Sequence, residues 1–473
     1  PNVTNPKVAA NMEYLLGMVD IANKRLNGDA TTDYLHSEYA TQYAADTVAA
    51  NDAVGRLIKY ESKFFVTTTS STKTFSFKMS AKGTFMVDWG DGTKDIIKRT
   101  NTTETTYSHT YSAAGARTIG IGGRATGYGT STSTAAISFM GNYNVAGISG
   151  SLGTIFSTIG DGRGASQQPR FYNTFAGCSN LSGSIPENLF SGISGAPAQY
   201  MFSFTFQACS NLSGPIPENL FAGISGAPAD WMFNYTFYGC YHLSGSIPES
   251  LFAGISGAPA PYMFYNTFYS CSGLSGSIPE NLFAGISGAP AENMFGGTFK
   301  GCSGLSGSIP ENLFGEFSGA PAQYMFSSTF KGCSGLSGLI PGNLFAGISG
   351  APAPYMFNST FEGCSGLTGP IPENLFAGIS GAPATYMFYF TFSGCNGLTS
   401  IPQNLFGDIS GMVQTLMFTS MFNGCTSLTG ASAKINGKYL YEIWPDATKA
   451  QVGSCYKGDT KLDDYADIPA TWK

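Results

Sequence analysis

The sequence predicts a multidomain chain whose larger part is an α/β solenoid, preceded by an all-β sandwich and an N-terminal helical module. Three observations lead to this prediction. A unit of about 31 residues recurs from residue 170 to about 430, strand-like alternation runs through 62–126, and an apolar helical stripe lies within 7–27. A fixed period of this length is typical of stacked coils and not of a compact enzyme core.

Cysteine marks the period of the repeat. One cysteine per coil, at one equivalent position, predicts a buried ladder of free thiols, because disulfide frameworks show several cysteines per small unit at mixed spacings. No CxxC motif or Cys/His cluster is present, so neither a metal nor a cofactor is expected. The cysteines at intervals of 31, followed by two at intervals of 30, are Cys178, Cys209, Cys240, Cys271, Cys302, Cys333, Cys364, Cys395, Cys425 and Cys455.

The most regular segment of each coil is Met-Phe-x-x-Thr-Phe-x-x-Cys, which begins at Met201 in the copy at 198–228. Its recurring residues fall at i, i+1, i+4, i+5 and i+8. This spacing predicts a short helix, because a strand face would have a period of two. The Ser-Gly-Pro-Ile-Pro run at 213–217 predicts an extended segment. Strands stack more closely than helices, so the helices are expected on the convex side of a curved stack.

The regions before the repeats have a different character. Residues 1–61 contain two amphipathic helical patterns and are interpreted as an attachment or oligomerisation module, with a simple amphipathic cap as the alternative. Residues 62–126 alternate apolar and polar side chains, most clearly at Thr74–Met79 and Phe85–Trp89, and predict strands.

The remaining boundaries follow from composition. Residues 127–169 are rich in Gly, Ser and Thr and are interpreted as a linker with a degenerate first coil. Residues 170–430 form the repeat array. The charged stretch 431–473 is expected to be a C-terminal cap, because a terminal coil must give an apolar stack a polar outer face.

Two resemblances to known families rest on specific motifs. The pair Asp-Trp-Gly-Asp-Gly-Thr (88–93) and Ser-His-Thr-Tyr-Ser-Ala-Ala-Gly (108–115) resembles the PKD domain, a small immunoglobulin-like β-sandwich. It implies a spacer or adhesion module, in which Asp88 and Asp91 are interpreted as turn acids, with calcium binding as the alternative. The repeated Thr-Phe-x-Gly-Cys-Ser-x-Leu-Ser-Gly-x-Ile-Pro-Glu-Asn-Leu-Phe resembles the BspA-type leucine-rich repeat of bacterial surface proteins. It implies adhesion without catalysis, although the inserted Ala-Gly-Ile-Ser-Gly-Ala-Pro-Ala lengthens the unit.

Charge excludes one class of partner. The net charge is −6, and Lys300 and Lys331 are the only Lys or Arg residues between Cys178 and Gly430. Nucleic acid is therefore not an expected partner, because phosphate binding needs clustered basic side chains. The chain is also not expected to be an enzyme. Its three histidines lie in three different regions, and no nucleophile, metalloprotease or phosphate-loop motif appears.

No uncharged apolar run reaches the ~18–20 residues that span a bilayer. No signal peptide is visible. The first residue, Pro1, fits a processed mature form as well as a chain that has lost its initiator Met, and the sequence leaves both open. The expected location is extracellular, on a cell surface or exposed on a virion.

The positions that differ between coils predict the binding site. They lie one residue before the repeated Met and two, three and six residues after it, and a helical wheel turns all four outward. They carry mainly Tyr, Ser, Asn, Gly and Phe, a mixture typical of antibody paratopes. Neutral drift would favour Lys, Glu and Gln instead. The predicted binding residues are Tyr200, Phe204, Trp231, Tyr235, Tyr238, Tyr262, Tyr265, Tyr269, Tyr324, Tyr355, Tyr386, Tyr389 and Phe390.

These observations together predict an adhesin or receptor-recognition protein that binds a protein or glycan on a cell surface through its aromatic face. The alternative is a structural subunit of an extracellular filament, a coat or a phage tail or fibre, which self-associates through the same face. A homo-oligomer formed through the N-terminal helices is compatible with either.

Overall fold

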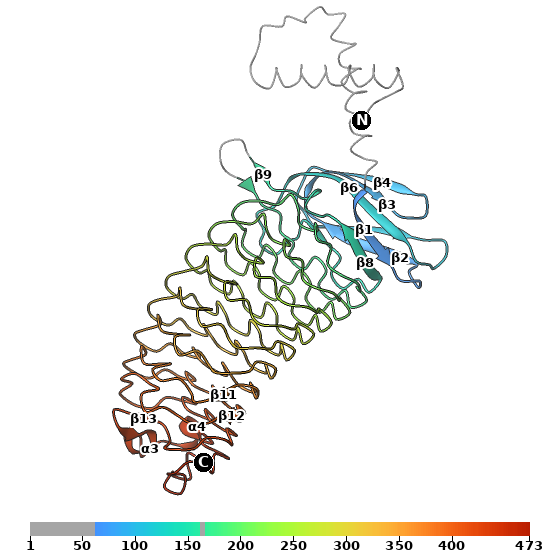
Figure 1. Ribbon diagram of the computed structural model, residues 1–473. Helices are drawn as coiled ribbons and strands as arrows, with labels where there is room; N and C mark the ends of the chain where they lie inside the picture. Colours follow the sequence, from blue (N-terminus) through green and yellow to red (C-terminus); the bar gives the residue numbers. More distant parts are fainter. Residues whose placement is uncertain (1–61, 161–165) are drawn as a thin grey trace, which may run out of the picture. The chain divides into compact units, whose positions relative to one another are not determined.

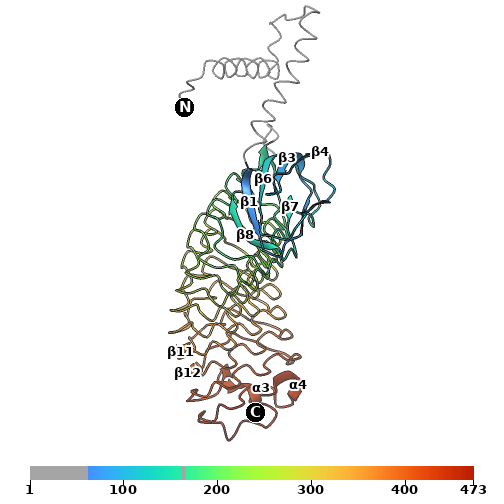
Figure 2. The ribbon, with the colours of Figure 1, turned by 90° about the vertical axis from the view of Figure 1, so that its right-hand side faces the viewer.

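The computed structural model describes residues 62–160 and 166–473 (Figure 1). The predicted N-terminal helical module at 1–61 lies outside the described residues. The described chain begins with two β-sheets and continues as successive coils that lie one on another (Figure 2).

The first sheet has five strands in the order β4-β3-β6-β1-β8. Within it, β1 and β8, β3 and β4, and β3 and β6 pair antiparallel. The second sheet has three strands in the order β5-β2-β7 and is antiparallel. The strands are β1 (Ser62–Thr68), β2 (Thr74–Met79), β3 (Lys82–Asp88), β4 (Lys94–Arg99), β5 (Thr105–Thr110), β6 (Thr118–Gly127), β7 (Ile137–Ser138) and β8 (Val145–Gly150).

The strands predicted at Thr74–Met79 and Phe85–Trp89 are confirmed as β2 and most of β3. The stretch 127–169, interpreted as a linker and first coil, contributes β7 and β8 to the two sheets. Its pairing with distant strands could not be seen in its composition, because glycine and serine give no alternating pattern.

Aromatic side chains join the two sheets. The Phe77 ring of β2 lies 6.1 Å from that of Trp89, which follows β3, and 5.8 Å from that of Phe139. The Tyr111 hydroxyl donates to the Trp89 carbonyl at 2.8 Å. All four side chains are buried, so the sandwich has one aromatic core.

The turn after β3 takes the conformation that its glycines predict. Gly90 has φ of 77°, and a Cβ there would lie 2.5 Å from the Thr118 carbonyl oxygen. Asp91 accepts hydrogen bonds from the Thr93 amide and hydroxyl and pairs with His109 at 2.8 Å. Asp88 pairs with Lys94 at 2.7 Å. Both carboxylates thus serve the turn, as the turn-acid interpretation predicts.

The predicted α/β solenoid is wrong. No helix occurs in the repeats at 170–430, and the helices of the described residues are α3 (Leu440–Ile443) and α4 (Lys449–Val452), of four residues each. The β-type pairing between neighbouring coils is mostly limited to isolated parallel bridges such as Gly214↔Leu243 and Gly226↔Ile255, which do not build a continuous sheet. The remaining short strands are β9 (Ile159–Gly160), β10 (Ser166–Gln167), β11 (Thr368–Gly369), β12 (Gly397–Leu398), β13 (Lys434–Ile435) and β14 (Lys438–Tyr439).

A run of tight turns replaces the expected helix. Every fourth residue has a left-handed backbone, with φ of 59° at Tyr200, 58° at Phe204 and 57° at Ala208. Between these residues, amides donate three residues back, as Thr205 N–H does to the Phe202 carbonyl at 3.2 Å. The recurring offsets i, i+1, i+4, i+5 and i+8 fit a period of four residues as well as one of 3.6. A pattern of only nine residues therefore could not distinguish the two periods.

The other amides of each turn segment bind the next coil. The N–H groups of Phe202, Phe204 and Phe206 donate to carbonyls 30 residues ahead at 2.8–2.9 Å. Backbone groups therefore alternate between local turns and the neighbouring coil, and this satisfies buried groups that a helix would have satisfied internally. A single coil would lose half of these bonds, so the coils depend on their neighbours.

The interior of the stack consists of phenylalanine ladders. Phe202 and Phe233 stack with centroids 5.7 Å apart, and Phe206 and Phe237 repeat the same spacing. A third ladder contains Phe221, whose ring lies 4.5 Å from that of Phe202. The same contacts recur in successive coils, and the ladder phenylalanines are buried. Each such pair adds ~0.5–1.5 kcal/mol beyond the burial of its area.

The cysteines are all free and buried, which confirms the predicted free thiols. Each ladder thiol donates to a carbonyl of the preceding coil, as Cys240 Sγ does to Phe206 at 3.1 Å. The assignment of Cys455 to this ladder is wrong, however. Tyr456 stacks on Phe422 and continues that ring ladder, so Asp459, three residues further on, takes the ladder position that the sequence assigns to Cys455.

Candidate functional site

The predicted aromatic residues form one feature, called here the outer aromatic row. All thirteen predicted residues are half-buried, so each presents part of its ring to solvent. They lie on the tight turns and not on helices. Tyr172 of the first coil extends the row, although the sequence analysis did not single it out: its ring meets those of Tyr200 at 5.9 Å and Phe204 at 5.7 Å.

The turn backbone places these rings outside. Trp231 and Tyr235 have φ of 60° and 54°, whereas Met232 and Phe233 between them point inward and are buried. A left-handed backbone costs roughly 1–2 kcal/mol in a residue with a Cβ. Hydrogen bonds between coils hold it in place, since Trp231 N–H donates to the Pro261 carbonyl and Tyr235 N–H to that of Tyr265.

The N-terminal part of the row is dense. Trp231 lies between Tyr200, at 5.6 Å, and Tyr262, at 3.8 Å, with nearly parallel rings. Phe204 and Tyr235 stack similarly at 5.0 Å. Because these rings cover one another's faces, they present mainly edges and hydroxyl groups outward.

One hydroxyl in this part is already engaged. Tyr262 donates to Glu292 at 2.6 Å. Burial, followed by this acidic neighbour, raises the pKa of Tyr262 to about 12, so its hydroxyl remains a donor at neutral pH.

A ring-free coil interrupts the row. Asn293, Gly296 and Gly297 occupy the row positions there and are buried. The row resumes with Tyr324, Tyr355 and Tyr386, which stack at 4.4 and 4.3 Å. The structure thus divides the predicted site into two aromatic patches, a feature that the single helical face did not anticipate.

Little positive charge lies near the row. Lys331 pairs with Glu362 at 2.7 Å, and Lys300, which lies 4.5 Å from the centroid of the Tyr269 ring, keeps its charge. One lysine is a weak attraction for an anionic ligand, which needs clustered basic side chains. The row therefore suits a partner that offers apolar area and hydrogen bonds.

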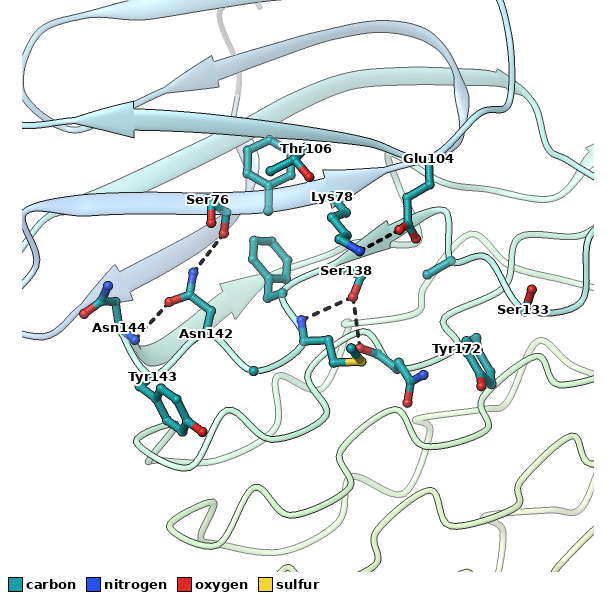
Figure 3. A pocket seen from close by; sticks show the side chains of 16 residues that line it. Ser76, Lys78, Glu104, Thr106, Ser133, Ser138, Asn142, Tyr143, Asn144 and Tyr172 are labelled. Carbon is teal, nitrogen blue, oxygen red and sulfur yellow. Dashed lines mark hydrogen bonds and ion pairs between the residues drawn. The ribbon is translucent and has the colours of Figure 1, made fainter.

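A second candidate site lies where the sandwich meets the first coil (Figure 3). This junction groove has a volume of about 600 Å³. It is lined by Ser76, Phe77, Lys78, Glu104, Thr106, Ser133, Ala135, Ser138, Phe139, Met140, Gly141, Asn142, Tyr143, Asn144, Tyr172 and Asn173. The sequence analysis missed it, although Gly-Asn-Tyr-Asn at 141–144 offers an aromatic ring and amides in a turn-prone stretch.

A third hollow of about 700 Å³ follows the repeated Ile-Pro-Glu segments and is lined in part by Glu218, Glu249, Glu280 and Glu311. Asn281 Nδ2 donates to Glu249 Oε1 at 2.6 Å. Side-chain bonds between coils thus use part of this acidic row. Isoleucine and proline line it beside the acids, and no aromatic ring does.

The reactive side chains of the described residues are engaged elsewhere. His109 stacks on Trp89 at 5.0 Å and pairs with Asp91, and His242 Nδ1 lies 2.5 Å from the Ser210 carbonyl oxygen. Burial raises the pKa of Cys302 to about 12, which keeps its thiol protonated. Within 62–160 and 166–473, no group of three or more His, Cys, Asp or Glu side chains is placed to hold a metal ion.

No protein-family model matches this chain, and no curated protein is detectably similar to it, so the PKD and BspA resemblances stay predictions. Among the described residues, no helix combines the length and apolar character needed to cross a membrane.

Proposed function

We propose that this protein is a non-enzymatic binding protein, an adhesin or receptor-recognition protein, that engages a cell-surface protein or glycan through the outer aromatic row. One observation carries the proposal. The row varies from coil to coil, as in Tyr200, Trp231 and Asn293, while the buried ladder beside it keeps phenylalanine throughout the repeats at 170–430. Folding alone requires the ladder and does not explain why the varied positions are so rich in tyrosine.

The geometry of the row suits recognition. Parallel stacking holds the Trp231 and Tyr262 rings, and hydrogen bonds between coils hold their backbone. A partner would therefore meet a preorganised surface, and little side-chain entropy would be lost on binding. An extracellular, cell-surface or virion-exposed location belongs to the same proposal. Buried free thiols would be protected in an oxidising environment.

A structural role is the second candidate: a subunit of an extracellular filament, a coat or a phage tail or fibre. The paired charges of Lys331 and Glu362 favour it, because a locally neutral aromatic surface can also meet a second copy of itself. Light scattering at rising protein concentration separates the two. A stable monomer supports the binding protein, and ordered polymers support the structural subunit.

The test of the proposed function uses substitutions that the chain already contains. Trp231→Asn, Tyr235→Ser and Tyr238→Ser introduce residues found at the equivalent positions of other coils, namely Asn293, Ser328 and Ser393. The triple variant should fold and lose at least ten-fold in capture of cells or immobilised glycans. Unchanged capture by a folded triple variant would refute the role of the row.

A matched control removes exposed apolar area elsewhere. Leu339, 58% exposed, lies on the Ile-Pro-Glu side of its coil and not on the row. Leu339→Ala should leave capture unchanged. The Leu339→Ala variant and the triple variant should both unfold as cooperatively as the parent protein. A loss of capture with Leu339→Ala would mean that the ligand does not select the row.

A further inference from the structure

The junction groove is built by three distant parts of the chain. Strand β2 supplies Ser76 and Lys78, the loop between β7 and β8 supplies Asn142 and Asn144, and the first coil supplies Tyr172 (Figure 3). Parts so far apart in the sequence meet only in the folded protein, which makes the groove a fixed feature of the junction.

Hydrogen bonds hold the loop in place. Asn142 Nδ2 donates to the Ser76 carbonyl at 2.8 Å, and Asn142 Oδ1 accepts from the Asn144 amide at 3.0 Å. Asn144 Nδ2 donates to the Thr74 carbonyl at 3.1 Å. The loop is thus tied to β2 at two points, and the side chain between the two asparagines is presented on a rigid support.

That side chain is Tyr143, and its ring is free. It is 66% exposed, and no aromatic ring of the described residues stacks on it. Met140, 56% exposed, lies in the same loop. Tyr143 differs in this respect from the outer aromatic row, where rings such as Trp231 are covered on both faces. An uncovered ring on a fixed loop can take a flat apolar ligand surface against its face.

Several polar side chains of the groove have unused hydrogen-bonding atoms, and the charges of the groove sum to zero. Lys78 and Glu104 are its only charged lining residues, and they pair at 2.8 Å. Among the described residues, no hydrogen bond occupies the second Glu104 oxygen, the Thr106 hydroxyl or the side-chain amide of Asn173. The groove therefore offers donors and acceptors to a neutral ligand that is rich in hydroxyl groups.

We propose that the junction groove binds a neutral saccharide. The C–H face of one sugar unit lies on Tyr143 at one end of the groove, and the hydroxyls of further units of the same oligosaccharide hydrogen-bond Asn173 and the Glu104–Lys78 pair at the other end (Figure 3). The chemistry matches because a pyranose has one apolar face and an equatorial rim of hydroxyl groups. An anionic glycan does not match, since the single cation is already neutralised.

Tyr172 connects this site to the proposed function. It lines the groove and also contacts Tyr200 and Phe204, the first rings of the outer aromatic row. A glycan held in the groove could continue along that row. The groove inference rests on the proposed function only for the biological setting of the ligand, and its own test does not use the row.

The experiment screens the full-length chain against an array of neutral oligosaccharides of glucose, N-acetylglucosamine, mannose and galactose. Isothermal titration then measures affinity for the best ligand. Tyr143→Ala should weaken binding at least ten-fold, Tyr143→Phe should keep most of the affinity, and Glu104→Gln should weaken binding several-fold. Leu339→Ala is the control of similar exposure and should bind like the parent.

Two outcomes overturn the inference: no neutral saccharide binds, or Tyr143→Ala binds as the parent does. Binding restricted to anionic sugars overturns it as well. The row triple variant separates the two proposals. If it loses cell capture but keeps saccharide binding, the groove acts independently of the row. If it keeps cell capture while Tyr143→Ala loses saccharide, the groove inference stands and the proposed function of the row fails.

Discussion

The buried phenylalanine ladders and the outer aromatic row are made by the same turns, yet they differ in what they reveal. Phe233 and Phe264 stack at 5.8 Å inside, and Trp231 and Tyr262 stack at 3.8 Å outside. Both spacings follow from coils that lie in register. Ring stacking by itself is therefore no sign of function. The two differ in variation and exposure, because only the outer positions change from coil to coil and remain open to solvent.

The largest expected effect on stability comes from the buried phenylalanine ladders. Phe264 lies between Phe233 and Phe295 at 5.8 Å and contacts Phe252 and Phe283 at 4.7 and 4.8 Å. Phe264→Ala should cost ~3–5 kcal/mol of unfolding free energy, because a cavity opens at the crossing of two ladders. Denaturant unfolding measures it. A loss below about 1 kcal/mol would show that the interior is not tightly packed.

The second effect tests the end of the thiol ladder. Asp459 is fully buried, its carboxylate oxygens meet no hydrogen-bond partner among the residues that the structure describes, and burial raises its pKa to about 8. The folded state therefore holds a proton that the unfolded chain releases near its ordinary pKa of 3.8. The stability contributed by this group is full below pH 3.8 and falls as pH rises to about 8, by at most ~1.4 kcal/mol per pH unit.

Asp459→Cys restores the residue that other coils carry at this position, and Asp459→Asn removes the titrating group. Denaturant unfolding between pH 5 and 9 should show a smaller decline for both variants than for the parent. Cys425 and Cys455, which lie near Asp459, are the same in all three proteins and do not account for a difference in slope. Equal pH slopes in the three proteins would contradict a proton held on Asp459.

The third effect concerns the outer aromatic row. Tyr355 stacks on Tyr324 and Tyr386 at 4.4 and 4.3 Å, and its φ is 59°. Tyr355→Asn should cost only about 1 kcal/mol, because the lost stacking is offset in part by an asparagine that tolerates the left-handed backbone. Thermal or denaturant melting measures it. A loss as large as that of Phe264→Ala would make the row structural and remove the contrast.

The fourth expected effect, no larger than that of Tyr355→Asn, is on the thiol ladder. Cys302 Sγ donates to the Phe268 carbonyl at 2.9 Å and is buried. Cys302→Ala should cost about 1 kcal/mol, since one weak hydrogen bond and a small volume are lost. In the native parent, a thiol reagent should modify none of the ten cysteines until denaturant is added. Rapid native modification would show that the coils open locally.

The sequence predicted part of this architecture for identifiable reasons. Strands β2 and β3 were visible because their apolar residues alternate, and the Trp89–Thr93 turn because glycine permits positive φ. The repeat and the free thiols followed from a single spacing. The helices were wrong because a period of four and a period of 3.6 coincide over nine residues. The thirteen residues of the predicted row lie on the turns and are half-buried, and their role in binding stays a prediction. The sequence analysis did not recognise the interruption at Asn293 as a division of the row.

The amino-acid sequence by itself determined the length of the coil, the side chains that must be buried together and the positions free to vary, because these follow from a regular spacing of residues. The tertiary structure alone decided the backbone of the turns, since alternate amides find their partners 30 residues away in the next coil. It also decided the junction groove and the burial of Asp459. Both arise from segments distant in sequence, whose contact no local pattern encodes.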